Sequence, residues 1–178
     1  SHPNALFYSF SSGAIPFVPY AAVGGAASGA RLAIEGGALQ LRNAYAGSFS
    51  VDTKTPPFDA LTLSDLYFDY KLTPEVKVNL FFRCSGVYYS VYFSGPRRVR
   101  AGALYLGTIE GVKADGNWHR AHVPLRDWLR KLNPRAATLP VSEVVIGNWD
   151  NTGYLMAGFG GNGPGASWSM RNWSLVGT

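Results

Sequence analysis

Aromatic rings that alternate with polar side chains are the most distinctive chemistry in this sequence. In residues 76–84 and 87–93, every second position is apolar or aromatic, and the positions between them include amide, guanidinium and phenol groups. Successive side chains of a strand point to opposite faces of a sheet, so one set should face a core and the other solvent. Residues 66–71 and 118–123 alternate in the same way. The outward positions with binding chemistry are Tyr67, Asp69, Asn79, Phe81, Arg83, Tyr88, Tyr92, Arg120 and His122.

This mixture of outward groups suits carbohydrate recognition. An aromatic ring offers a flat apolar surface to the C–H face of a pyranose, whose partial positive charge meets the π cloud. Forked guanidinium groups and planar amides or carboxylates read hydroxyls through paired hydrogen bonds. The alternative is structural, because cross-strand aromatic pairs stabilise a sheet without any ligand and outward rings can be buried beneath loops.

A second candidate site lies in residues 147–152, where Trp149 stands among glycine, asparagine, aspartate and threonine. Ligand sites at the ends of sheets are commonly built from such loops. The alternative role for Trp149 is to anchor a strand end in the core. The other tryptophans singled out, Trp118, Trp168 and Trp173, are expected to be core residues.

Catalytic motifs are missing from the sequence. It contains no H-E-x-x-H, no G-x-S-x-G and no cysteine–histidine pairing. Glycoside hydrolysis needs two convergent carboxylates, and the 11 Asp and Glu residues form no closely spaced cluster of the kind found in sandwich-type glycanases. His119 and His122 are three residues apart on an expected strand, so they point to opposite faces and make a poor metal pair. We therefore expect no enzyme activity.

The elements that must position these groups are short strands. Charged residues make up only 15% of the chain, against about 25% in an ordinary soluble domain. The 21 glycines, 11 prolines, 10 tyrosines and 10 phenylalanines fit a protein of strands and turns. About ten short strands with regular turn signals predict an all-β sandwich, and only residues 125–132 have helical spacing. Expected inward positions are Leu66, Phe68, Tyr70, Val78, Leu80, Phe82, Cys84, Val87, Tyr89, Val91, Phe93, Ala121 and Val123.

Net charge, cysteine content and the length of apolar runs limit the partners and structural features that we expect. The net charge is +5, but the 16 basic residues are scattered, whereas a nucleic-acid binder gathers them on one face. We therefore expect no nucleic-acid partner, and acidic polysaccharide stays open. Cys84 is the single cysteine, which excludes an internal disulfide and suits a small buried hydrophobe. No apolar run approaches the roughly 20 residues of a membrane span.

Three segments together resemble strands of β-jelly-roll carbohydrate-binding modules of the galactose-binding-domain-like type. Residues 115–125, Asp-Gly-Asn-Trp-His-Arg-Ala-His-Val-Pro-Leu, resemble a tryptophan-containing strand that ends in Pro-Leu before a short helix. Residues 168–176, Trp-Ser-Met-Arg-Asn-Trp-Ser-Leu-Val, are similar to the closing strand, although Arg171 stands where Asp is common. Residues 6–10, Leu-Phe-Tyr-Ser-Phe, are similar to the aromatic first strand. The resemblance implies a jelly roll of two antiparallel sheets.

The same resemblance implies that residues 1–178 form one non-catalytic carbohydrate-binding module, in which Ser1 and His2 resemble a cloning remnant. Such modules are secreted or lie at the cell surface, and they target an appended enzyme or surface protein to a polysaccharide or oligosaccharide. No cofactor is required, but many such modules carry a structural calcium ion near their first loops. The dispersed carboxylates that could serve a calcium ion are Glu35, Asp52 and Asp59.

Two other functions fit parts of the pattern. A structural or adhesive module would bind a protein partner through the same outward surface. A jelly-roll polysaccharide lyase would need groups to remove a proton and steady a carboxylate, although the strand motifs expected of lyases are missing. The residues that could play those roles are Tyr88 or Tyr92 with His122, Arg83 and Asn79.

Overall fold

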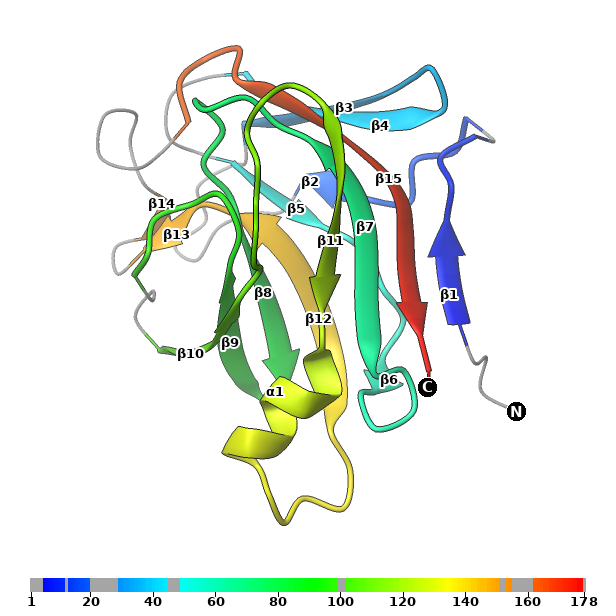
Figure 1. Cartoon of the computed structure of the whole chain (residues 1–178), viewed down its shortest axis with the longest axis vertical. Coiled ribbons are helices and arrows are strands. Elements are labelled where there is room, and N and C mark those ends of the chain that lie inside the picture. Colours follow the sequence, from blue (N-terminus) through cyan, green and yellow to red (C-terminus); the bar gives the residue numbers. More distant parts are fainter. Residues whose placement is uncertain are drawn as a thin grey trace.

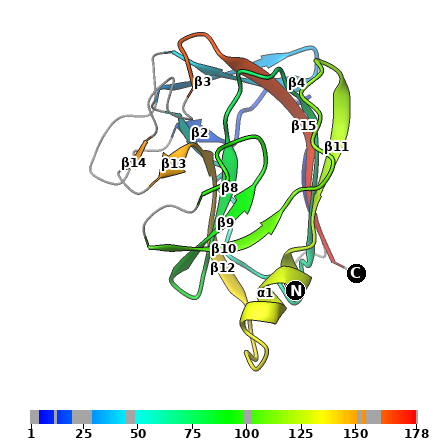
Figure 2. The same cartoon turned by 60° about the vertical axis from the view of Figure 1, so that its left-hand side comes forward.

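The structure is a computed structural model that describes residues 5–11, 13–19, 29–44, 49–98, 102–150, 153–154 and 162–177. Its strands form two large sheets, together with a two-stranded hairpin and one short helix. Figure 2 shows the two sheets facing each other, with the helix near one end of the sandwich. The jelly-roll type of β-sandwich with one short helix that the sequence predicts is confirmed.

The first sheet has the strand order β11-β7-β15-β4-β3, and β1 pairs with the last residues of β15. All of these pairs are antiparallel. The long strand β15 crosses the middle of the sheet in Figure 1. The bounds are β1 Ala5–Tyr8, β3 Ala30–Glu35, β4 Ala38–Asn43, β7 Asp65–Lys71, β11 Trp118–Val123 and β15 Ser167–Val176.

The second sheet has the order β10-β9-β8-β12-β5-β2, and β6 also pairs with β12. Here β10 runs parallel to β9, an exception to the antiparallel arrangement expected from the sequence. The separate hairpin consists of β13 (Trp149–Asp150) and β14 (Gly153–Tyr154). The bounds are β2 Val18–Pro19, β5 Ser50–Asp52, β6 Phe58–Asp59, β8 Asn79–Cys84, β9 Val87–Tyr92, β10 Ala103–Thr108 and β12 Pro140–Gly147.

The core lies between the two sheets and is built from the alternate positions that the sequence predicts. Aromatic rings from both sheets meet there: Phe93 lies 5.4 Å from Phe68 and 5.0 Å from Tyr70, measured between ring centroids. Trp168 and Trp173 are buried, and so is Cys84, whose burial raises the pKa of its thiol. Val87 is the exception to the predicted inward set, since it is 37% exposed where β9 leaves the hairpin turn.

Local sequence explains the two tight hairpins and the helix. The turns between β3 and β4 and between β8 and β9 need a positive φ at both central residues, which Gly36-Gly37 and Ser85-Gly86 adopt. The helix α1 (Leu125–Leu132) starts after Pro124, buries Leu125 and Leu129, and contacts β7 and β10. In the part of the chain that the structure describes, no helix is long and apolar enough to cross a membrane.

Candidate functional site

The structure divides the predicted site residues between two opposite faces of the sandwich. Tyr67, Asp69, Arg120 and His122 belong to β7 and β11 of the first sheet. The predicted residues of β8 and β9 belong to the second sheet, and the outer faces of the two sheets look away from each other (Figure 2). The single surface expected from the sequence is therefore wrong, because alternation separates inward from outward positions but does not assign a strand to a sheet.

Three tyrosines line the outer face of the second sheet at its β9–β10 edge, and we call this group the tyrosine surface. Tyr88 and Tyr92 come from β9, and Tyr105 comes from β10. The register places Tyr105 beside Ser90, between the other two rings, and Tyr105 is 47% exposed. The rings of Tyr92 and Tyr105 have centroids 4.9 Å apart and are inclined by 41°.

Charged groups surround these rings. The Arg83 guanidinium lies 5.4 Å from the centre of the Tyr88 ring, and the Arg97 guanidinium lies 5.6 Å from the centre of the Tyr92 ring. The Tyr88 hydroxyl donates a 2.7 Å hydrogen bond to Glu143 Oε2. The tyrosine surface therefore combines aromatic faces with forked donors and a carboxylate acceptor, which are the groups that read sugar hydroxyls.

The surroundings of Tyr92 favour its neutral form. Burial of the ring raises the pKa of Tyr92, the neighbouring Tyr105 adds to the increase, and the charge of Arg97 opposes it. Because the ordinary pKa of tyrosine already lies well above neutrality and that of Tyr92 is raised further, the hydroxyl is protonated at neutral pH and can both donate and accept a hydrogen bond.

Two predicted contact residues are instead buried beside the tyrosine surface, on the neighbouring strand β8. Phe81 is only 1% exposed and packs with Val145, with Tyr88 packed against them. The side-chain oxygen of Asn79 accepts hydrogen bonds from the backbone N–H groups of Phe93 at 2.8 Å and Gly95 at 3.1 Å. Phe81 therefore offers no ring face to a ligand, and Asn79 acts on the loop that leads to Arg97.

Tyr105 is the residue of this surface that the sequence reasoning missed. The segment Ala103–Thr108 reads Ala-Leu-Tyr-Leu-Gly-Thr, a short run with β-forming residues that could have been identified as a strand. Its pairing with β9 joins segments on either side of an intervening loop, and it is this pairing that brings Tyr105 beside Tyr92.

On the outer face of the first sheet, the predicted residues contact one another. The rings of Tyr67 and His122 stack at 4.4 Å with planes 5° apart, and the Arg120 guanidinium lies 5.1 Å from the Tyr67 ring centre. His122 Nε2 lies 2.7 Å from Asp65 Oδ1, and the Ser64 hydroxyl donates to the other carboxylate oxygen at 2.6 Å. These side chains therefore use many of their ring faces and hydrogen-bonding groups in contacts with one another.

A β-bulge in β15 gives Asp69 its partners. The register of β15 against β7 shifts between Arg171 and Ser174, and Asn172 there adopts a φ of +55°. Asn172 Nδ2 donates to Asp69 Oδ2 at 2.8 Å, and Arg171 Nε lies 3.5 Å from the same oxygen. Trp118, expected in the core, is instead half-buried on this outer face, with the Arg171 guanidinium 4.0 Å from its ring centre.

The remaining predicted positions do not form a site among the described residues. The side chain of Trp149 lies outside them, and only its strand pairing with Tyr154 is described. The carboxylate of Asp52 accepts from the backbone of Lys54, and that of Asp59 accepts from Leu61 and Leu139. Within the described ranges, no three histidine, cysteine, aspartate or glutamate side chains gather as a metal site. Calcium binding stays a prediction.

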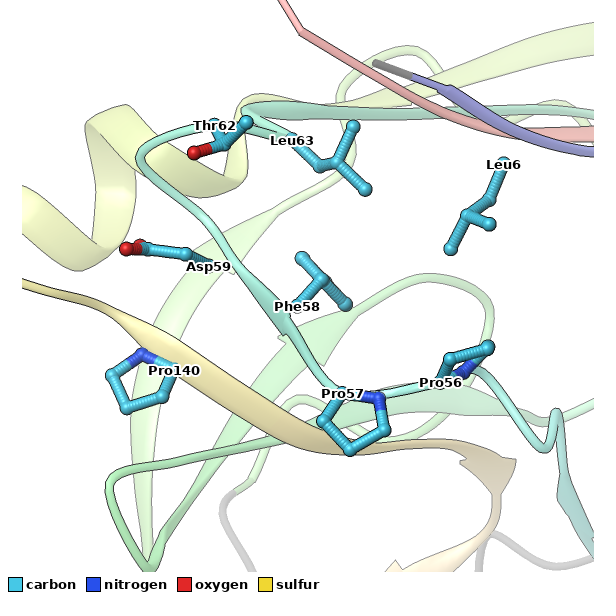
Figure 3. Close-up of a pocket in the computed structure, with 8 residues that line it drawn as sticks. All are labelled: Leu6, Pro56, Pro57, Phe58, Asp59, Thr62, Leu63 and Pro140. Carbon is cyan, nitrogen blue, oxygen red and sulfur yellow. The ribbon is translucent and has the colours of Figure 1, made fainter. Parts of the chain in front are cut away.

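An apolar cavity of about 450 Å³ lies at one end of the sandwich, beside β1 and β6. Figure 3 shows Leu6, Phe58 and Leu63 pointing toward one another across it, with the Asp59 carboxylate turned away. This cavity has no arrangement of polar groups that would read sugar hydroxyls. The lining residues are Leu6, Pro56, Pro57, Phe58, Asp59, Thr62, Leu63 and Pro140.

Comparison with known proteins finds similar structures but no similar sequence. No protein-family model and no curated protein matches the chain. A family 29 carbohydrate-binding module is similar at 14% identity and a TM-score of 0.45, over 96% of this chain and 88% of that one. A variant of such a module complexed with cellulohexaose is 13% identical, with a TM-score of 0.45, over 98% of this chain and 92% of that one.

A further variant complexed with mannohexaose is 14% identical, with a TM-score of 0.44, over 96% of this chain and 91% of that one. These structures are carbohydrate-binding modules, as are the proteins that the three sequence segments resemble. Identities and TM-scores of this size do not establish a shared function, so the site is defined by the side chains of this chain.

Proposed function

We propose that this chain is a non-catalytic module that binds a polysaccharide across its tyrosine surface. The observation that carries the proposal is the exposed ring of Tyr105, which packs against Tyr92. Arg97 lies beside the Tyr92 ring, and Arg83 and Glu143 contact Tyr88 on the same face. Exposed aromatic groups with a polar rim mark interaction sites in soluble proteins. Ring faces provide stacking for pyranoses, and the charged groups provide directional hydrogen bonds.

The spacing of the rings supports an extended ligand. Tyr88 and Tyr92 are four residues apart on β9, and four residues of a strand cover about 13 Å. Since this distance is longer than one pyranose ring, a ligand that contacts both tyrosines contains several sugar units. We therefore favour an oligosaccharide segment of a polysaccharide over a monosaccharide.

The wider biological role belongs to the same proposal. The resemblance of three strands to secreted carbohydrate-binding modules supports an extracellular module that holds an appended enzyme or surface protein on its polysaccharide. The proposed role requires no proton transfer and no cofactor.

The proposal is tested by affinity electrophoresis through neutral and acidic polysaccharides. We expect at least one glycan to retard the wild-type protein, and Tyr105→Ala to weaken that binding by about tenfold, or ~1.4 kcal/mol. Phe7→Ala is the matched control, because it removes a 59% exposed ring from the other sheet. Equal weakening in both variants, or no retardation by any glycan, would contradict the proposal.

A protein-binding module is the second candidate, favoured by the apolar edge of the second sheet. Leu104, next to Tyr105 in the chain, is 53% exposed, and Val87 at the start of the neighbouring strand β9 is 37% exposed. In addition, β10 is an edge strand that another chain could extend. A glycan panel without any binding, together with loss of a protein partner in Leu104→Ser, would support this candidate. A lyase would instead release an unsaturated sugar that absorbs ultraviolet light.

A further inference from the structure

Two arginines stand directly opposite each other on the outer face of the first sheet. Arg31 on β3 pairs in register with Arg42 on β4, and both side chains are exposed. Like charges at directly opposed positions destabilise a sheet, so this pair weakens the fold unless an anion lies between or above the two groups. Neither arginine has an ion pair with a carboxylate among the described residues, and Arg31 Nη1 donates a 3.0 Å hydrogen bond to the Ala30 carbonyl.

The neighbouring positions extend this pair into a larger surface. Cross-strand register continues from Arg42 to Ser167, and the next row runs from Gln40 through Ser169 and Lys71 to Trp118. Lys71 is exposed, and its ammonium lies 5.7 Å from the Trp118 ring centre. We call the set that comprises Arg31, Gln40, Arg42, Lys71, Ser167 and Ser169 the arginine surface.

Acidic groups lie at the margins of the arginine surface. Asp69 pairs with Arg171, and Glu35 stands opposite Ala38 at the turn end of the β3–β4 hairpin. Glu75 lines a groove with residues 163–166, just before β15 begins. The two rows that hold Arg31, Arg42 and Lys71 contain no carboxylate, and they face away from the tyrosine surface.

From these contacts we infer that the arginine surface binds a carboxylated polysaccharide, as a second site opposite the tyrosine surface. A guanidinium matches a carboxylate through two parallel hydrogen bonds, and the opposed pair presents two such forks side by side. Gln40, Ser167 and Ser169 supply the donors and acceptors that sugar hydroxyls require. Four strand spacings of about 4.8 Å separate β3 from β11, which is room for several sugar units.

A polysaccharide fits this surface better than a nucleic acid does. Nucleic-acid binding draws most of its affinity from many phosphate contacts. Among the described residues, the arginine surface offers three cations that form no ion pair with a carboxylate, Arg31, Arg42 and Lys71, and carboxylates lie at its margins. Sparse cations among hydroxyl and amide groups suit a polymer with one charge per sugar. The inference does not depend on the tyrosine surface, because the two sites share no residue.

The test uses Arg31→Gln with Arg42→Gln and two probes that share one backbone. Affinity electrophoresis through polygalacturonate should show binding by the wild type that falls at least tenfold in the double variant and weakens as salt is raised. Fully methyl-esterified pectin, which lacks the negative charges, should bind weakly to both proteins. The melting temperature of the double variant should equal or exceed that of the wild type, since the like-charge pair is gone.

Lys131→Gln with Arg135→Gln is the matched control, because both residues are exposed near the end of α1 and the change in net charge is the same. Equal loss of binding in this control would overturn the inference in favour of a net-charge effect. Stronger binding of a DNA oligonucleotide, lost in the Arg31 and Arg42 double variant, would overturn it in favour of a nucleic-acid surface. Tyr105→Ala should leave polygalacturonate binding unchanged, and a loss there would mean one shared site.

Discussion

At the scale of single residues, partners decide whether an outward side chain is free for a ligand. Phe81 and Tyr88 occupy outward positions of paired strands, but Val145 helps to bury Phe81 while Tyr88 keeps part of its ring accessible. Asn79 is outward as well, and its amide is used by the backbone of the following loop. Residue type alone therefore overstates the number of contact residues.

The pKa of Asp65 links the stability of the fold at acid pH to one side chain. Burial raises the pKa of Asp65, but hydrogen bonds from Ser64 and His122 and the charges of His122 and Arg126 outweigh it, so the pKa lies below its ordinary value of 3.8. A depressed pKa in the folded state contributes stability above the ordinary value, and this contribution disappears as the pH falls through the folded pKa.

We therefore expect the free energy of unfolding to decline as the pH drops below about 4, and Asp65→Asn to flatten that decline. Urea unfolding at a series of pH values measures both. Asp127→Asn is the control, because its exposed carboxylate should contribute little. If Asp65→Asn leaves the pH profile unchanged, the contacts of Asp65 with His122 and Ser64 do not stabilise the folded state.

At the scale of elements, irregular strands shape both outer faces. The bulge in β15 directs Arg171 and Asn172 toward Asp69 on β7. The parallel strand β10 adds Tyr105 to a face that otherwise carries Tyr88 and Tyr92. Each irregularity places side chains on an outer face at positions that regular alternation along one strand does not predict.

Gly107 links β10 to the helix, and its substitution should affect the tyrosine surface indirectly. A Cβ at this position would lie 2.5 Å from the Trp128 ring, so Gly107→Ala must displace either α1 or β10. We expect a loss of about 1–3 kcal/mol in stability and weaker glycan binding through Tyr105. Chemical denaturation and affinity electrophoresis measure the two effects.

A double-mutant cycle separates this contact from a general effect of alanine. In a Trp128→Ala background, where the ring is absent, Gly107→Ala should cost much less stability than in the wild type. Equal costs in the two backgrounds would show that the close approach of Gly107 to Trp128 does not limit the packing of β10.

At the scale of the whole molecule, the two sheets present different chemistry to opposite sides. The outer face of the second sheet carries three tyrosines, of which Tyr105 is exposed, whereas that of the first sheet carries Arg31 directly opposite Arg42. If both faces bind glycans, one copy of the domain can hold two polysaccharide chains at once, with the hydrophobic core between them.

If the tyrosine surface and the arginine surface bind independently, their ligands should not compete. A neutral oligosaccharide that saturates the tyrosine surface should leave the dissociation constant for polygalacturonate within about twofold, a difference of ~0.4 kcal/mol. Isothermal titration with and without the neutral ligand measures this, with Tyr105→Ala as the reference in which the neutral ligand is lost. Mutual displacement of the two ligands would show a single overlapping site.

Local sequence was sufficient for features that depend on near neighbours along the chain. The period of two placed Phe68 and Phe82 in the core, paired turn residues predicted the hairpins, and the spacing of Leu125 and Leu129 predicted the helix. Those signals arise from backbone geometry, which a few consecutive residues control.

The assignment of strands to sheets depends on contacts between distant segments, and there the sequence reasoning failed. Only the fold separates Arg83 on β8 from Arg120 on β11, packs Phe81 beside Val145 of β12, and brings Tyr105 alongside Tyr92. Alternation along a strand is the same whichever sheet the strand joins. The residues predicted to form one surface therefore lie on two opposite faces of the sandwich. The sheet that each strand joins is determined by hydrogen bonding between strands that are far apart in the chain.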